Sequence, residues 1–444
     1  MCVALLRGPR AVVRAIRLAA ERTPPHRDRH LDLLRAVAIL AVVLGHWLAV
    51  VVTYHGGFGG DTVLAAVPWT RPLTWAFQVM PVFFLVGGFV NAASLDSYRR
   101  RGGTATGWFL GRTDRLIRPT TVFLLTLSAV ALLAVLLGAG EGTVATGVWL
   151  AVMPLWFLVA YLAVVLLTPV MLALHRRAGL AVPVVLAALV GLGDAVRLRS
   201  GPPLLGQAGF VFAWLAIHQL GIAWREGALP ARRTVALPMA AGGLAVLVLL
   251  TTVGPYPVSM VAVPGERLQN TSPPTLALLA LATAQTGLAL LLHGPADRRL
   301  RRARPWAVVV GVNSVIMTVF LWHLTAVVVA AVALYPAGLM PQPPAGSASW
   351  LLLRLPWIAC LLVVLAVLVA VFGRVERRAG PVPGADGPAS GVPRAVAAVA
   401  GAALAAGGLL GAAVTLPARL PVPMLLAYLA GAGLLRFLRR RPGS

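Results

Sequence analysis

The segment Leu31–Val52 reads LDLLRAVAILAVVLGHWLAVVV, an almost unbroken apolar run that carries three ionisable side chains, Asp32, Arg35 and His46. At about 1.5 Å per residue, a helix of this length crosses the roughly 30 Å hydrocarbon core of a bilayer. Ionisable groups are costly in hydrocarbon, so a span that keeps them turns them inward, toward partners, water or a substrate. The segment therefore predicts a membrane-spanning helix with a polar interior face.

The three ionisable residues are expected on one stripe of that helix. At about 100° per residue, Arg35 and His46 lie about 20° apart around the axis, and Asp32 lies within about 60° of either. His46 is about 21 Å along the axis from Asp32. We expect Asp32 and Arg35 at one membrane surface and His46 in the far half of the bilayer. A packing histidine with an ion pair at the helix end is the simpler alternative.

Composition places the whole chain in the membrane class. It has 444 residues, of which 59% are hydrophobic and only 11% charged, and long apolar runs recur throughout. An all-α polytopic membrane protein is therefore expected. The formal net charge is +25 and all 38 basic residues are arginine. These arginines alternate with the apolar runs and form no separate basic domain, so nucleic acid is not an expected partner. No metal site is expected, because the histidines lie on separate segments without clustered carboxylates.

Twelve helical spans are expected. Their approximate ranges are 31–53, 72–94, 119–138, 147–172, 179–195, 204–224, 234–253, 274–293, 306–335, 350–373, 395–416 and 422–437. The segments between them alternate between arginine-rich and nearly arginine-free, and both ends of the chain belong to the first kind. Arginine collects on the cytoplasmic side, so we expect a multi-pass protein of the plasma (inner) membrane with both termini in the cytoplasm.

A stretch rich in proline and glycine, 374–394, is expected to be a cytoplasmic linker. It divides the chain into a basic N-terminal segment (1–30), a ten-span core (31–373) and a terminal two-span hairpin with a basic tail (395–444). The hairpin is poor in polar groups and is expected to pack against the core through small residues.

A second candidate site lies at the cytoplasmic start of the third span. Arg112, Arg115 and Arg118 recur every three residues, so on a helix they form one basic ridge at the aqueous surface. Guanidinium groups grip phosphate oxygens bidentately, which suits a phosphorylated ligand. An ordinary arginine-rich cytoplasmic flank is the alternative.

Polar residues also interrupt other spans. They are Gln78 and Asn91 in the second, His218 in the sixth, and Asn313 and His323 in the ninth. Counted from residue 306, His323 lies about 25 Å along its span, a depth comparable with that of His46. Each could be a structural hydrogen-bonding group or part of a site. The long outer loop 254–273 is a candidate lid or acceptor platform, and a solvated connector is equally compatible with its sequence.

Several of these segments together resemble the membrane acyltransferase 3 family, over residues 28–373. The most specific is Leu31–His46, which is very close to the first-helix signature of the family. Met80–Phe89, the Arg112-x-x-Arg115 pair, Leu155–Leu158 and Leu321–His323 are similar to its other landmarks. The whole pattern is similar to an actinobacterial branch, and the last two spans lie outside the resemblance.

The resemblance implies transfer of an acyl group from cytoplasmic acyl-CoA to a hydroxyl of a glycan, lipid or small molecule, as in O-acetylation of cell-envelope components. It implies acyl-CoA as co-substrate and no permanently bound cofactor. It assigns the catalytic histidine to His46 and supporting roles to Arg35 and to Arg112 with Arg115. Many members carry a glutamate that partners the histidine, but Tyr161 stands about there in this chain. The group that orients His46 is therefore open.

These inferences combine into one hypothesis. CoA phosphates dock on Arg112, Arg115 and Arg118. The thioester arm extends along the polar stripe formed by Asp32, Arg35 and His46, passing Arg35, and neutral His46 deprotonates the acceptor hydroxyl. The remaining candidates for acceptor binding or for support of His46 are His323, His218, Gln78, Asn91, Asn313 and Tyr161. A twelve-span secondary transporter is the alternative function, because polar residues within spans also suit a transport path.

Overall fold

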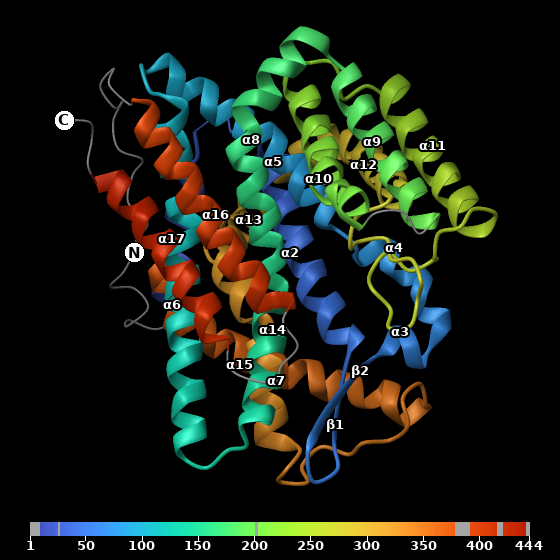
Figure 1. The fold of residues 1–444 in the computed structure, drawn as a ribbon, viewed down its shortest axis with the longest axis vertical. Helices are drawn as coiled ribbons and strands as arrows, with labels where there is room; N and C mark the ends of the chain where they lie inside the picture. The colour runs from blue at the N-terminus through green and yellow to red at the C-terminus, as the bar shows by residue number, and fades with distance from the viewer. Residues whose placement is uncertain (1–8, 25–26, 200–202, 378–390, 415–420, 441–444) are drawn as a thin grey trace. The chain divides into compact units, whose positions relative to one another are not determined.

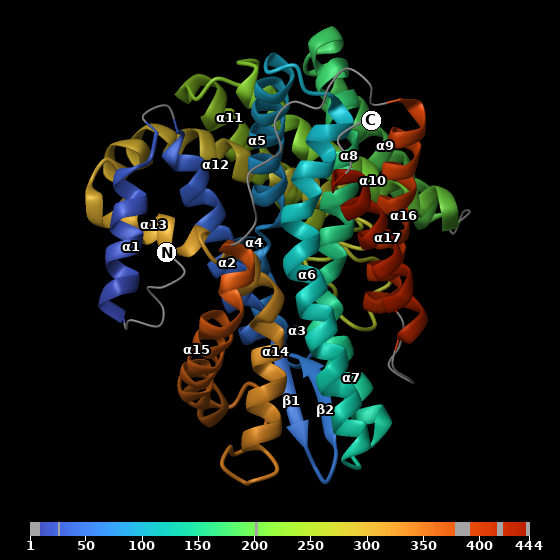
Figure 2. The same cartoon turned by 90° about the vertical axis from the view of Figure 1, so that its left-hand side faces the viewer.

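The computed structural model describes residues 9–24, 27–199, 203–377, 391–414 and 421–440. Within them the chain is almost entirely helical, with one two-stranded hairpin (Figures 1 and 2). Eleven of these helices are long and apolar enough to cross a membrane. The protein is thus an all-α polytopic membrane protein, as expected from its composition.

The chain forms two compact units, each assembled from separate stretches of sequence. The first comprises Met1–Gly45, Thr62–Ala93 and Leu167–Ser314, and the second comprises His46–Asp61, Ser94–Leu166 and Val315–Ser444. Three helices run from one unit into the other: α2 (Arg29–Ala49), α5 (Met80–Arg100) and α8 (Trp156–Ala178).

The first unit contains further helices that lie wholly within it. They are α1 (Pro9–Glu21), α3 (Val63–Ala66), the 3-10 helix η2 (Pro68–Leu73), α4 (Thr74–Phe77), α9 (Ala181–Leu198), α10 (Pro203–Arg225), α11 (Arg233–Thr252), α12 (Leu276–Leu300) and α13 (Ala303–Asn313). Helix α9 packs along α10, and α11 packs along α12. Helix α1, in the expected N-terminal segment, packs on α13 through Ala20 and Trp306.

The second unit contains the hairpin and seven more helical segments. They are β1 (Val50–Tyr54), β2 (Phe58–Thr62), α6 (Ala105–Leu136), α7 (Glu141–Val152), the 3-10 helix η3 (Met153–Leu155), α14 (Ile316–Leu334), α15 (Ala348–Arg377), α16 (Val392–Val414) and α17 (Val422–Arg440). Helix α14 packs against α6, α7 and α15, and α16 packs along α17.

Helices stand at the positions of all twelve expected spans. The expected sixth span forms α10, a continuous helix of 23 residues. Its apolar sequence is interrupted by the polar residues His218 and Gln219, and it is not among the eleven apolar candidates. Most of the expected linker 374–394 lies outside the described residues, as does the tail after Arg440. Helix α15 continues to Arg377, and α16 begins at Val392.

The first span ends earlier than the expected 53. Helix α2 stops at Ala49, and Val50–Tyr54 forms β1, which pairs with β2 across a turn at Gly56. The β-branched residues that continue the apolar run favour a strand over a helix. Residues distant in the sequence fix the hairpin. Gln342 forms two hydrogen bonds with the backbone of Tyr54, and Arg354 donates to the carbonyl oxygen of Val50. His46 therefore lies in the last turn of α2 and not in mid-helix.

The expected ninth span, 306–335, is broken into α13 and α14. The side chain of Asn313 donates to the carbonyl oxygens of Asp32 and Val309, and Ser314 Oγ donates to that of Gly311. Side chains that bond nearby backbone in this way compete with helix continuation. Helix α14 begins as a separate helix at Ile316. The Glu376 carboxylate lies at its N-terminus and accepts hydrogen bonds from the backbone N–H groups of Met317 and Thr318.

Two other boundaries also differ from expectation. The expected second span, 72–94, lies within the apolar candidate Pro68–Arg100, which is made of η2, α4 and α5, and the long helix α5 begins only at Met80. Helix α6 begins at Ala105, capped by Thr104, whose side chain accepts from the backbone N–H of Gly107. The basic ridge is therefore inside a helix of 32 residues and not at its start.

Helices α5 and α10 cross at two glycines. A Cβ added at Gly88 would overlap the carbonyl oxygen of His218, and one added at Gly221 would overlap that of Leu85. Close backbone approach of this kind replaces hydrophobic attraction as a source of helix association in lipid.

We predict that Gly88→Ala lowers the thermal stability of the protein by about 1–3 kcal/mol, because the added methyl forces the two helices apart. Gly209→Ala on α10 is the control, since nothing lies within 4 Å of a Cβ there. The measurement is the fraction of monodisperse protein left after heating in detergent. Equal loss in both variants would contradict the close crossing.

Candidate active site

His46 and His323 form the most distinctive polar contact of the second unit. His46 ends α2 and His323 lies in α14, yet His46 Nδ1 is 2.9 Å from His323 Nε2. The rings are nearly parallel, with centroids 5.0 Å apart and an interplanar angle of 19°. His323 is fully buried, whereas His46 is half-buried. The pair therefore lies at the edge of the buried interior, with His323 on the inner side.

The hydrogen bonds around His323 fix which nitrogen of each ring carries a proton. His323 Nδ1 lies 2.6 Å from the carbonyl oxygen of Phe320, which can only accept, so this nitrogen carries a proton. In a neutral ring His323 Nε2 is then an acceptor, and His46 Nδ1 must donate to it. The lone pair of neutral His46 is consequently on Nε2.

Neighbouring side chains hold this pair in place. Trp47 Nε1 donates to the carbonyl oxygen of His323 over 2.9 Å, which ties the end of α2 to α14. Phe320 packs edge-on against Phe157, and Tyr161 stacks on Phe157. The structure therefore brings His323 to His46, and it places Tyr161 beside Phe157.

Asp32 and Arg35 lie in the part of α2 that belongs to the first unit. The buried Asp32 carboxylate takes two hydrogen bonds from Arg27, at 2.6 and 3.0 Å, while Arg35 Nη1 is 4.0 Å away. The bond to Asp32 raises the pKa of Arg27 above its ordinary value, although burial opposes this. The sequence analysis did not single out Arg27. An arginine five residues before a buried aspartate at a helix start is the signal that could have identified it.

The basic ridge lies along one helix, α6, in the second unit. Arg112 and Arg118 are half-buried and Arg115 is exposed. Asp114, between them in sequence, is buried and forms an ion pair with Arg439 of α17. An acidic residue within a run of arginines is a signal, visible in the sequence, that Asp114 is paired. The sequence does not identify its partner, which lies 325 residues away.

His218 and Asn91 meet inside the first unit. Both are fully buried, and Asn91 Nδ2 is 3.3 Å from His218 Nε2 near the crossing of α5 and α10. Each supplies a polar partner that the other needs in an apolar setting. The geometry is that of an internal polar pair.

Gln78 joins the helices of the first unit to the outer loop. It lies between α4 and α5, and its Nε2 donates to the carbonyl oxygen of Met260 over 2.9 Å. Its own carbonyl oxygen accepts from Gln285 of α12. Gln78 thus holds the loop 254–273 in place.

The outer loop is a packed structure and not a solvated connector. Asn270 is fully buried, donates to the carbonyl oxygens of Pro257 and Ser259, and accepts from the Thr275 hydroxyl. Tyr256 donates to the Asp194 carboxylate over 3.0 Å. Burial and the nearby Asp194 raise the pKa of Tyr256 well above its usual range, so the phenol stays protonated and continues to donate.

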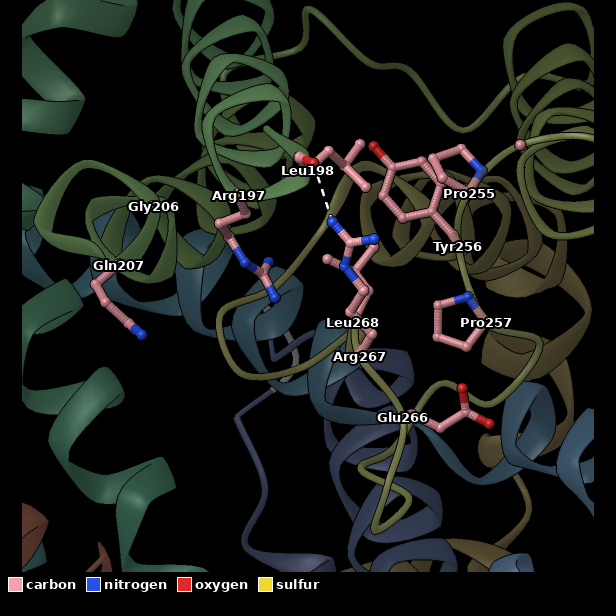
Figure 3. A pocket seen from close by; sticks show the side chains of 11 residues that line it. Arg197, Leu198, Gly206, Gln207, Pro255, Tyr256, Pro257, Glu266, Arg267 and Leu268 are labelled. Carbon is pink, nitrogen blue, oxygen red and sulfur yellow. Dashed lines mark hydrogen bonds between the residues drawn. The ribbon is translucent and has the colours of Figure 1, made fainter. Parts of the chain in front are cut away.

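A cavity of about 580 Å³ lies beside this loop in the first unit (Figure 3). Arg197 and Arg267 reach into it from α9 and from the loop, and Glu266 lies on its rim. The guanidinium groups are already engaged, since Arg267 donates to the carbonyl oxygen of Leu198 and Arg197 to that of Pro273. None of the site residues expected from the sequence lines this cavity.

Comparison with models of protein families gives a match over most of the chain. The model of the acyltransferase 3 family, described as an acyltransferase domain, matches residues 28–374. That range holds both histidines of the pair and the basic ridge, and it ends before α16. No curated protein and no solved structure matches the chain.

We predict that Asn270→Ala loosens the outer loop, because it leaves buried carbonyl oxygens without their donor at about 1–3 kcal/mol each. The measurement is the rate of tryptic cleavage after Arg267, which is exposed. Gln269→Ala, a half-buried neighbour, is the control. A loop that is a solvated connector would be cleaved at the same rate in both variants and in the parent protein.

Proposed function

The chain belongs to the acyltransferase 3 family of membrane acyltransferases, and on that premise we propose that it transfers an acyl group from cytoplasmic acyl-CoA. The acceptor is a hydroxyl of a glycan, lipid or small molecule near the outer face of the plasma membrane. Both termini lie in the cytoplasm, since most arginines flank the spans on the side of the chain ends. The observation that carries the proposal is the hydrogen bond between His46 and His323.

His46 acts as the general base. Its Nε2 lone pair takes the proton of the acceptor hydroxyl while the hydroxyl oxygen attacks the thioester carbonyl carbon. The new C–O bond forms, the C–S bond breaks, and the CoA thiolate leaves with the electron pair. The imidazolium of His46 then returns its proton to that thiolate, so the base is regenerated.

His323 positions the base and does not touch the reacting atoms in this scheme. As an acceptor for His46 Nδ1–H, it keeps the lone pair of His46 on Nε2. When His46 becomes an imidazolium, the same hydrogen bond becomes charge-assisted and therefore stronger. The Phe320 carbonyl polarises His323 from the far side and adds to this stabilisation.

The basic ridge of α6 supplies the donor site. Arg112, Arg115 and Arg118 share one helix, and guanidinium groups bind phosphate oxygens through pairs of charge-assisted hydrogen bonds. CoA carries phosphate groups at the end remote from its thiol. The ridge therefore anchors the nucleotide part of acyl-CoA at the cytoplasmic side.

We predict that His46→Ala lowers kcat by about 10²–10⁴-fold, the contribution typical of a positioned base. His323→Leu lowers kcat by about 10–100-fold, and His323→Gln recovers part of this loss, because its amide oxygen can accept from His46 Nδ1–H. The measurement is release of CoA thiol by protein purified in detergent, with a panel of acyl-CoA chain lengths and candidate acceptors.

The exposed His55 provides a matched control, and His55→Ala is expected to leave turnover unchanged. Near-normal turnover by folded His46→Ala protein would disprove the assignment of the base. Because the assay contains no membrane gradient, turnover in it also separates acyl transfer from coupled transport.

We further predict that replacing Arg112 and Arg115 together by Gln raises the KM for acyl-CoA by about tenfold or more, through loss of phosphate contacts, with a smaller effect on kcat. Arg100→Gln, an exposed arginine at the end of α5, is the control. An unchanged dependence of rate on acyl-CoA concentration would remove the ridge from the donor site.

A further inference from the structure

The terminal hairpin, α16 with α17, contacts the helix that carries the basic ridge. It lies beyond residues 28–374, which match the family, yet α17 packs along α6 and α16 packs against α7 and η3. All of these segments belong to the second unit. The hairpin is therefore a fixed neighbour of α6.

Specific polar contacts join the hairpin to α6 and α7. Trp149 Nε1 donates to the carbonyl oxygen of Ala413. The Tyr428 hydroxyl, which is buried, lies 3.0 Å from both Thr121 Oγ1 and the carbonyl oxygen of Ile117. About one turn before Ile117 along α6, Arg439 forms an ion pair with Asp114. These contacts follow α6 into the segment that holds the three arginines.

Asp114 is the acidic residue of that segment, and its position on the helix determines how strongly it attracts the arginines of the ridge. At about 100° per residue it lies about 40° from Arg118 around the helix and one turn away, the spacing at which opposite charges attract. An uncompensated carboxylate there would compete with an incoming phosphate for the guanidinium groups and would lower the positive field that attracts it. The Arg439 guanidinium cancels this charge.

We propose that the hairpin is part of the donor site: Arg439 holds the Asp114 carboxylate and so prevents it from competing with the phosphates of acyl-CoA for the ridge of α6. Arg439 is a positioning residue and touches no reacting atom. This inference rests on the proposed function, because it takes the ridge to be the phosphate site. It gives the two spans outside the family match a role in substrate affinity.

The test measures the Kd of CoA itself for the full-length protein by calorimetry in detergent, so it does not depend on turnover. We expect Arg439→Gln to raise Kd about 3–10-fold at low salt, and this difference to shrink as ionic strength rises. Adding Asp114→Asn to Arg439→Gln should restore Kd, because the uncompensated carboxylate is then gone. Arg440→Gln, the exposed next residue, is the matched control and should leave Kd unchanged.

An unchanged Kd in folded Arg439→Gln protein, or a double variant that binds no better than the single one, would overturn the inference. If Arg439→Gln does not fold, the single variant Asp114→Asn is the test. The Kd of CoA for this variant should be at least about twofold lower than for the parent protein, and an equal or higher Kd would overturn the proposal. Failure of the proposed function looks different. In that case the Arg112 and Arg115 double variant would itself bind CoA normally.

Discussion

An ionisable or strongly polar side chain in hydrocarbon is stable only when another protein group meets it, and this constraint governs where the polar residues of the chain lie. Within the first unit Asp32 meets Arg27, and Asn91 meets His218. Within the second, His46 meets His323. The Asn91–His218 pair is fully buried, and in the first pair the Arg27 side chain is exposed while the Asp32 carboxylate is buried. The His46–His323 pair consists of two histidines whose hydrogen bonds leave a lone pair on Nε2 of neutral His46, and the proposed chemistry is placed there.

A second histidine as the partner of His46 changes the charge balance of the base that we propose. A carboxylate partner would give the resting pair a negative charge, which the proton taken from the acceptor would cancel. Two neutral imidazoles start without charge and become positive at the moment when the thioester oxygen and sulfur become negative. The pair therefore suits a reaction in which opposite charges develop together in a site of low dielectric, where their attraction is strong.

The sequence predicted the helices well, because apolar length and arginine flanks follow from the bilayer itself. It failed where local chemistry outweighs apolarity: Val50–Val52 pair as a strand, and Asn313 with Ser314 end a helix that the apolar run alone would continue. Depth along a helix can be counted, so His323 was expected at the level of His46. The contact between the two rings could not be predicted in the same way. The rotation of each helix about its axis depends on packing between segments 277 residues apart.

The short hairpin after α2 has a consequence for substrate choice. Gln342 and Arg354 fix β1 only a few residues beyond His46, while Trp47 fixes the last turn of α2. Anchored before and after in the chain, the backbone of His46 has little room to shift. On the proposed function, acceptors of different size would then be accommodated by other parts of the protein, and selectivity among them could change while the proton-accepting ring stays the same.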